Sequence, residues 1–143
     1  MATLQVRALH FAKNKGMEEK MKITLPVQKK EIKNKEIVTA ESEQEFDLDM
    51  SINAQIRFET KFPELARNED LFGYSKRIFD VKEQSLALII SKFKLIYCWF
   101  DTEMSFKDFL KLFDLTDEKY VKKLVATLNE VFELVADSSA EKN

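Results

Sequence analysis

The chain has 143 residues, a length that suits one domain with a single hydrophobic core. Its formal net charge is −2 with basic and acidic residues interleaved, which excludes a broad cationic face for nucleic acid. With 2 Gly, 2 Pro and 12 Phe, the composition favours long helices and an aromatic core, an apolar surface for a partner, or both.

Residues 1–20 differ in composition from the rest of the chain. They hold four basic and two acidic residues, a charge of +2, which leaves −4 for the remainder. They lack the continuous apolar centre of a secretory signal. Codons for the residues before Met21 can include a purine-rich stretch like a bacterial ribosome-binding site. We therefore predict that residues 1–20 form a disordered leader or lie upstream of the natural start, with an amphipathic helix as the alternative.

Two alternating patterns predict an N-terminal β-hairpin. Apolar residues alternate with polar ones over residues 22–27, and Pro26 restricts this strand to an edge or an end. Residues 45–50 show the clearest strand pattern, with Phe46 and Leu48 on one face. We expect these two segments to pair antiparallel. The polar residues 28–44 are expected to form an exposed connection, with at most a short strand at Ile37 and Val38.

The period changes from strand to helix at Ser51. Serine is a strong N-cap, and Ile52 and Ile56 follow at helical spacing, so both are predicted to face the core. Pro63 is expected to end or restart this helix. Two aromatic residues lie off the isoleucine stripe and are therefore predicted to be exposed: Phe58 and Phe62.

Helical spacing continues through the second half of the chain. A short helix is predicted over residues 74–81 and a central apolar helix over about 82–100. Ser105 is expected to start another short helix, and Thr116 to cap a final one. The sequence therefore predicts an α+β fold, mostly α, in which an N-terminal β-hairpin is followed by a compact bundle of four to five helices. We expect one domain over residues 21–135 and a frayed tail over residues 136–143.

Residues with catalytic or metal-binding potential are sparse. The single histidine, His10, lies in the predicted leader, so no histidine-based triad or metal site is expected in the domain. Asp47 and Asp49 could bind a cation or share a proton, but a solvated strand face is the favoured interpretation. Cys98 is predicted to be a buried, inert thiol, which suits a reducing cytoplasm. We expect no enzymatic activity, no cofactor and no metal.

The longest apolar stretch covers residues 86–100 and contains two lysines. A membrane-spanning helix needs about 20 apolar residues, so this segment is predicted to be a core helix and no membrane association is expected.

Four residues are candidates for binding a partner protein. Arginine beside aromatic residues is typical of protein interfaces, which favours Arg57, Phe58 and Phe62. Trp99 is added as an aromatic anchor. Two ordinary alternatives remain open: Arg57 could pair with Glu59 or Asp70, and Trp99 could belong to the core.

Several stretches in sequence order carry a family resemblance: SINAQIRFETKFPELA, DLFGYSKRI, an apolar helix ending IYCWFD, and then MSFKDFLKLFDL with TDEKYVKKL. From about residue 21 to the end, this pattern resembles the tail assembly chaperones of long-tailed, siphovirus-type bacteriophages and prophages of Gram-positive bacteria. The resemblance implies a non-enzymatic protein in the host bacterial cytoplasm. It implies that the protein binds the tape measure protein, keeps it soluble and helps recruit tail tube subunits.

Two other interpretations stay open. A prophage-encoded regulatory module that acts through protein–protein contacts without catalysis would be expected to show a basic recognition helix, and none is evident. A small enzyme with a dispersed site would be favoured by a deep pocket with converging carboxylates. Self-association also remains an option for the partner surface.

Overall fold

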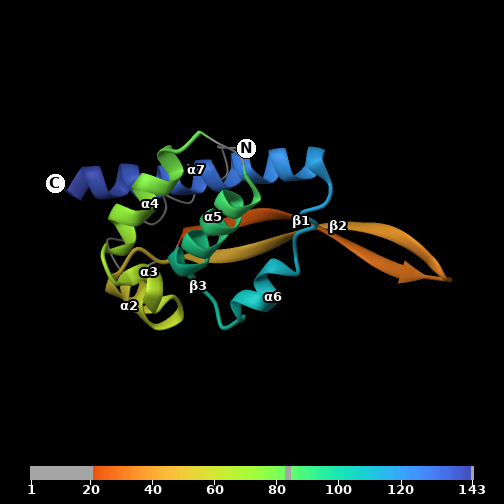
Figure 1. Ribbon diagram of the computed structural model, residues 1–143, viewed down its shortest axis with the longest axis horizontal. Helices are drawn as coiled ribbons and strands as arrows, with labels where there is room; N and C mark the ends of the chain where they lie inside the picture. The colour runs from red at the N-terminus through yellow and green to blue at the C-terminus, as the bar shows by residue number, and fades with distance from the viewer. Residues whose placement is uncertain (1–20, 83–84, 143) are drawn as a thin grey trace.

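A long antiparallel hairpin projects from a group of helices (Figure 1). The structure is a computed structural model that describes residues 21–82 and 85–142, so the predicted leader, residues 1–20, lies outside it. Strand β1 (Met21–Lys33) pairs with β2 (Glu36–Leu48) over their full length. Strand β3 (Phe100–Asp101) pairs with the other edge of β2, which gives the order β1-β2-β3.

The hairpin is much longer than the sequence pattern predicted. The predicted pairing at its base is confirmed, with Ile23 opposite Phe46. The predicted connection over residues 28–44 is wrong, because both strands continue to a two-residue turn at Asn34 and Lys35, whose φ angles are 52° and 64°. Such a turn matches the right-handed twist of the strands. The sequence pattern did not reveal the outer part of the two strands. Strands that extend beyond the core have no buried face, so their apolar and polar residues need not alternate.

Pro26 lies within β1 without breaking the ladder. The Gln28 N–H donates away from β2, to the Leu112 carbonyl oxygen at 3.2 Å. Backbone groups alternate between the two sides of a strand, so Pro26, two residues earlier, also faces away from β2. Its missing N–H therefore removes no hydrogen bond between β1 and β2, and the predicted edge position of this strand is confirmed.

The helices have the following bounds: α2 Ile52–Lys61, α3 Pro63–Ala66, α4 Leu71–Asp80, α5 Leu86–Trp99, α6 Phe106–Leu110 and α7 Glu118–Lys142. The α+β class is confirmed, and the described residues contain six helices where four to five were predicted. One reason is that Pro63 starts the one-turn helix α3 directly after α2. Ser51 caps α2 as predicted, its hydroxyl accepting from the Asn53 N–H.

Helix α7 differs from the prediction at both ends. Its N-cap is Asp117 rather than Thr116, since the Tyr120 N–H donates to the Asp117 carboxylate at 3.2 Å. At the other end the helix continues to Lys142, through residues that were expected to form a frayed tail. Ser138 is buried there, so the helix still covers the domain beyond residue 135.

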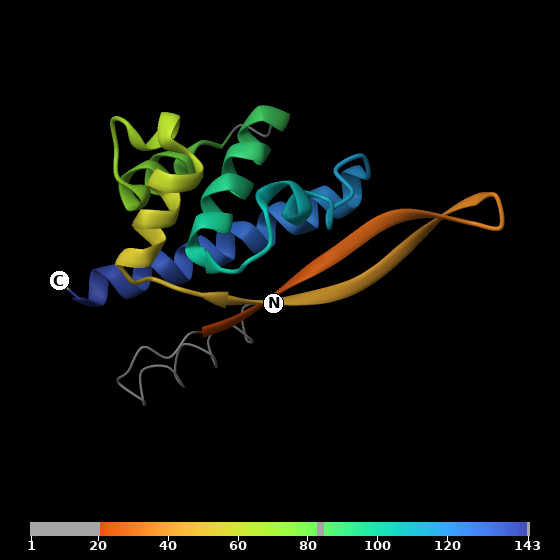
Figure 2. The same cartoon turned by 90° about the horizontal axis from the view of Figure 1, so that it is seen from below.

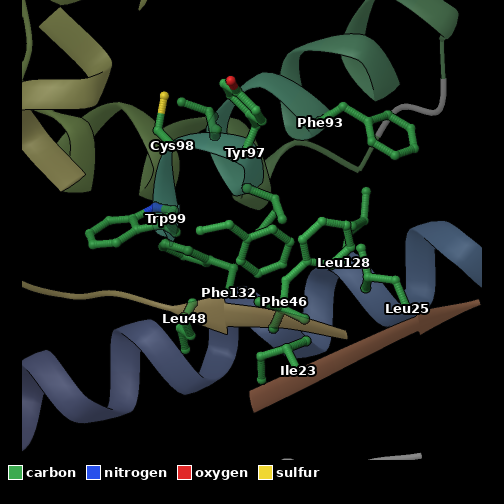
Figure 3. Close-up of a cluster of buried hydrophobic side chains, with 14 of the residues drawn as sticks. Ile23, Leu25, Phe46, Leu48, Phe93, Tyr97, Cys98, Trp99, Leu128 and Phe132 are labelled. Atoms are coloured by element: carbon green, nitrogen blue, oxygen red, sulfur yellow. The ribbon is translucent and has the colours of Figure 1, made fainter. Parts of the chain in front are cut away.

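The core lies where the base of the hairpin meets α5, α6 and α7. Figure 3 shows its side chains from the hairpin, α5 and α7. The Phe46 ring stacks on Phe100 with centroids 4.8 Å apart and meets the edge of Phe109 at 5.4 Å. No Phe in the described part of the chain is exposed. The aromatic core expected from composition is therefore present, and it anchors the base of the hairpin.

Candidate functional site

The most prominent surface feature is the outer half of the hairpin, residues 29–40, which we call the hairpin arm. It extends away from the helices in both views (Figure 1, Figure 2). Ile32 and Ile37 lie opposite each other near its tip and are 78% and 71% exposed. Two large apolar side chains at the end of a projecting arm are typical of a surface that a partner covers.

The base of the arm is fastened to the segment before α7. The Gln28 amide donates from Nε2 to Asp117 Oδ2 at 2.8 Å, and this hydrogen bond is the main reason that the pKa of Asp117 is lowered. Lys30 donates to Thr116 Oγ1 at 2.7 Å and forms an ion pair with Asp114 at 3.2 Å. The Thr116 hydroxyl in turn is the largest cause of the lowered pKa of Asp114. These contacts fix the direction in which the arm projects.

Charge is divided between the two strands of the hairpin. Strand β1 carries four lysines and one glutamate, whereas β2 carries five acidic residues and no basic one. In β2, Glu41, Glu43 and Glu45 share one face and are all exposed. Strand β2 therefore presents a row of carboxylates to solvent.

A groove of about 490 Å³ lies between this face of the hairpin and the start of α7. Its lining includes Glu41 and Glu43 from β2 and Lys119 and Lys123 from α7, with Tyr120 beside β1. All four charged residues are exposed. A desolvated pocket with converging carboxylates would favour the interpretation as an enzyme. The lining of this groove is instead mixed in charge and exposed to solvent.

Two of the four predicted partner-binding residues, Phe58 and Phe62, were expected to be exposed, and this expectation is wrong. Their side chains are 0% and 7% exposed. Phe58 lies in α2, which packs against α5, and Phe62, the residue directly after α2, meets the Tyr97 ring of α5. Phe58 meets the Tyr74 ring at 6.0 Å, and Phe62 meets Phe106 at 5.3 Å.

The predicted inward stripe of α2 is wrong as well. Ile52 and Ile56 are 72% and 50% exposed. The sequence spacing allows either the isoleucine face or the aromatic face of α2 to be buried. The aromatic face is the buried one, because larger aromatic side chains remove more apolar area from water. Ile52 and Ile56 thus form an apolar surface that sequence reasoning assigned to the core.

Trp99 belongs to the core at the C-terminal end of α5 (Figure 3). Its indole Nε1 donates to the Ser75 hydroxyl at 3.2 Å, and Ser75 itself is fully buried. A buried tryptophan needs a partner for its N–H, and Ser75 supplies it. The ordinary alternative, core packing, is therefore correct and the exposed-anchor interpretation is not.

Arg57 braces the corner between β2 and α2. Its Nε donates to the Cys98 carbonyl oxygen at 2.9 Å, and its Nη2 lies 3.4 Å from Asp49 Oδ2. The expected partners, Glu59 and Asp70, are therefore wrong. This guanidinium joins the end of β2, α2 and the end of α5.

Asp49 is buried beside Arg57, so its expected place on a solvated strand face is also wrong. Burial opposes ionisation of Asp49, but hydrogen bonds with Ser51 and the charge of Arg57 outweigh that effect and lower its pKa. Asp47, in contrast, lies on the hairpin surface and pairs with Lys22 at 2.9 Å. The two carboxylates therefore have different ion-pair partners.

The Cys98 side chain is buried, as the sequence predicted. Burial raises the pKa of the Cys98 thiol to about 12, so it is protonated at neutral pH. Residues 21–82 and 85–142 contain no group of three or more His, Cys, Asp or Glu placed to hold a metal ion. Over the same residues, no helix has the length and apolar character needed to cross a membrane.

One buried charge was missed by sequence reasoning. Lys92 is 2% exposed, and its Nζ donates to Asn129 Oδ1 at 3.1 Å. It also lies 5.3 Å from the centre of the Phe79 ring, and burial lowers its pKa. Lys92 lies within the predicted central helix, but the spacing of residues along that helix does not show whether a lysine is buried or exposed.

Comparison with protein-family models, with curated proteins and with solved structures gives no match.

Proposed function

We propose that this protein is a tail assembly chaperone of the siphovirus type, acting without catalysis in the host bacterial cytoplasm. It binds the tape measure protein, keeps its apolar helical segments soluble and helps recruit tail tube subunits. The observation that carries the proposal is the hairpin arm, whose tip presents Ile32 and Ile37 to solvent. The identity of the partners rests on the resemblance of residues 21–143 to that family.

The energetics of the tip indicate how much of the surface a partner must use. Burying an isoleucine contributes about 1.5–3 kcal/mol, so the pair contributes roughly 3–6 kcal/mol before the costs of association. That range corresponds to a dissociation constant no tighter than about 0.04 mM. A lasting complex therefore needs further contacts along the arm or on the helices.

Co-expression with the tape measure protein and the tail tube protein of the same genome tests the proposal. We expect the chain to capture the tape measure protein in a pull-down and to increase its soluble fraction. The double variant Ile32→Thr/Ile37→Thr should lose most of this capture, because it removes apolar surface while threonine still suits a strand.

The matched control is Ile52→Thr/Ile56→Thr, which removes two exposed isoleucines from α2 instead of the arm. It should capture normally. Failure of the unmodified chain to bind either tail protein would refute the chaperone proposal, and equal loss in both double variants would refute the role of the arm.

A further inference from the structure

The outer edge of β2 has no partner strand between Ile37 and Glu45 in the part of the chain that the structure describes. Strand β3 covers that edge only at Asp47 and Leu48, and the Asp49 N–H donates to the Trp99 carbonyl oxygen at 2.8 Å. Backbone groups alternate along a strand, so every second residue before Asp49, from Asp47 back to Ile37, also points outward. Asp47 is covered by β3. The edge therefore presents the N–H and C=O groups of these residues: Ile37, Thr39, Glu41, Glu43 and Glu45.

A free edge of this length is a template for a further strand. The five residues are all exposed, and the strand lies on the side of the hairpin away from the contacts that fasten β1. A segment entering here would lie in line with β3 and would continue the sheet toward the tip of the arm. This mode of recognition takes its affinity from backbone hydrogen bonds and its selectivity from side chains at alternate positions.

Charge decides which strand fits. A second copy that paired through its own β2 would set glutamates against glutamates, and like charges directly opposite each other destabilise a sheet. The outer edge of β1 in a second copy is partly occupied, because Leu112 accepts from the Gln28 N–H and Lys30 is held by Asp114 and Thr116. Neither edge of another copy suits the edge of β2.

An incoming strand with basic side chains can pair with the outer edge of β2 without repulsion between like charges across the two strands. Lysines or arginines at alternate positions of an incoming strand would face Glu41, Glu43 and Glu45 as cross-strand neighbours. Lys119 and Lys123 line the groove on this face, but they belong to α7, which contacts β1 through Tyr120 rather than β2. The three carboxylates on this face outnumber these two lysines.

We propose that the free edge of β2 binds an extended segment of a partner protein with lysine or arginine at alternate positions, which adds to the sheet as a strand. The inference rests on the proposed binding role of the arm and specifies the chemistry of the segment that the arm takes from its partner.

The probe is a short capped peptide in which lysine alternates with threonine and valine, and its counterpart has glutamate in place of every lysine. We expect the full chain to bind the lysine peptide, and hydrogen exchange to slow at the amides of Thr39, Glu41, Glu43 and Glu45. The glutamate peptide should not bind. An unchanged exchange rate at these amides with the lysine peptide in excess would overturn the inference.

The variant Glu43→Pro separates strand pairing from simple charge attraction. Residue 43 donates outward, so proline there removes an edge donor and leaves the hydrogen bonds between β1 and β2 in place. Its matched control, Glu43→Thr, loses the same charge and keeps the N–H. We expect the proline variant to bind roughly tenfold more weakly than the threonine variant. Equal affinities would show that the lysines contact surface carboxylates without forming a strand.

Three outcomes distinguish this inference from the proposed function. If the tape measure protein is captured but the exchange rates do not change, the edge inference is wrong and the chaperone role stands. If the peptide protects the edge but no tail protein is captured, the edge binds basic strands and the chaperone proposal is wrong. Loss of both would overturn both.

Discussion

The hydroxyl of Tyr120 in α7 donates a hydrogen bond to the carbonyl oxygen of Pro26 in β1 at 2.7 Å. The two residues are 94 positions apart, so this bond joins the base of the hairpin to the last helix. The ring is buried, and burial raises the pKa of Tyr120, which keeps the hydroxyl protonated as a donor at neutral pH. Together with the contacts of Gln28 and Lys30, this bond attaches the base of the arm to the helical part of the chain.

Tyr120→Phe removes that hydrogen bond and keeps the ring. We expect the free energy of unfolding to fall by about 1 kcal/mol, measured by urea denaturation with an unchanged slope. Lys119→Ala, on the exposed side of the same turn, is the control and should change it by less than about 0.5 kcal/mol. Equal stabilities of Tyr120→Phe and the unmodified chain would contradict the role of this bond.

Phe58→Ala and Ile52→Ala compare the two faces of α2. Phe58 is fully buried, so its truncation leaves a cavity and should lower the free energy of unfolding by about 3–5 kcal/mol. Ile52 is 72% exposed, and its truncation should change the same quantity by about 0.5 kcal/mol or less. Thermal denaturation followed by circular dichroism gives both values, and a larger loss in Ile52→Ala would mean that α2 is turned the other way.

Asp49→Asn tests the brace made with Arg57. The pKa of Asp49 is lower in the folded chain than its ordinary value of 3.8, so ionisation of this carboxyl stabilises the fold above about pH 3.8. That stabilisation disappears as the pH falls through the lowered pKa. We expect the variant to be less stable by about 2 kcal/mol at pH 7, with the difference from the unmodified chain shrinking below pH 3.8. A difference that does not depend on pH would contradict this account.

Lys92→Met tests the buried lysine of α5. Burial lowers the pKa of Lys92, so the unfolded chain holds this proton more tightly, and the stability of the unmodified chain should rise as the pH approaches 10.5. We expect the variant to be more stable by roughly 1 kcal/mol at pH 7, since methionine fills similar space without a charge to desolvate.

The gain in Lys92→Met should diminish toward pH 10.5, where the lysine of the unmodified chain loses its charge in both states. Urea denaturation at several pH values measures how this gain in the free energy of unfolding depends on pH. Lys123→Met, on the exposed side of α7, is the matched control and should show no such dependence on pH. Destabilisation by Lys92→Met would show instead that the contact with Asn129 outweighs the cost of burial.

Local signals in the sequence predicted several elements correctly. Ser51 and Ser105 act as N-caps, because a serine hydroxyl accepts from nearby backbone N–H groups whatever the rest of the fold does. Alternation at Ile23 and Phe46 predicted the base of the hairpin, because one face of those strands is buried there. Cys98 was recognised as buried because it lies inside an apolar run.

The candidate surface was not predictable in the same way. The strands of the hairpin arm have no buried face, so their sequence lacks the alternation by which strands are found. Arg57 has its partners at Asp49 and at the carbonyl of Cys98, and the second of these contacts spans 41 positions in the chain. Sequence spacing carries no information about contacts of that kind.

What the sequence by itself determined is the class of the fold, the positions of the main turns between strand and helix, and the aromatic character of the core. These follow from interactions within a few residues and from the total apolar area to be buried. Only the tertiary structure decided that Phe58 and not Ile52 faces inward, and that residues 29–40 project as an arm with a free, acidic edge. The physical reason is that a side chain is buried only when another element packs against it, and the packing of α2 on α5 is a relationship between distant segments.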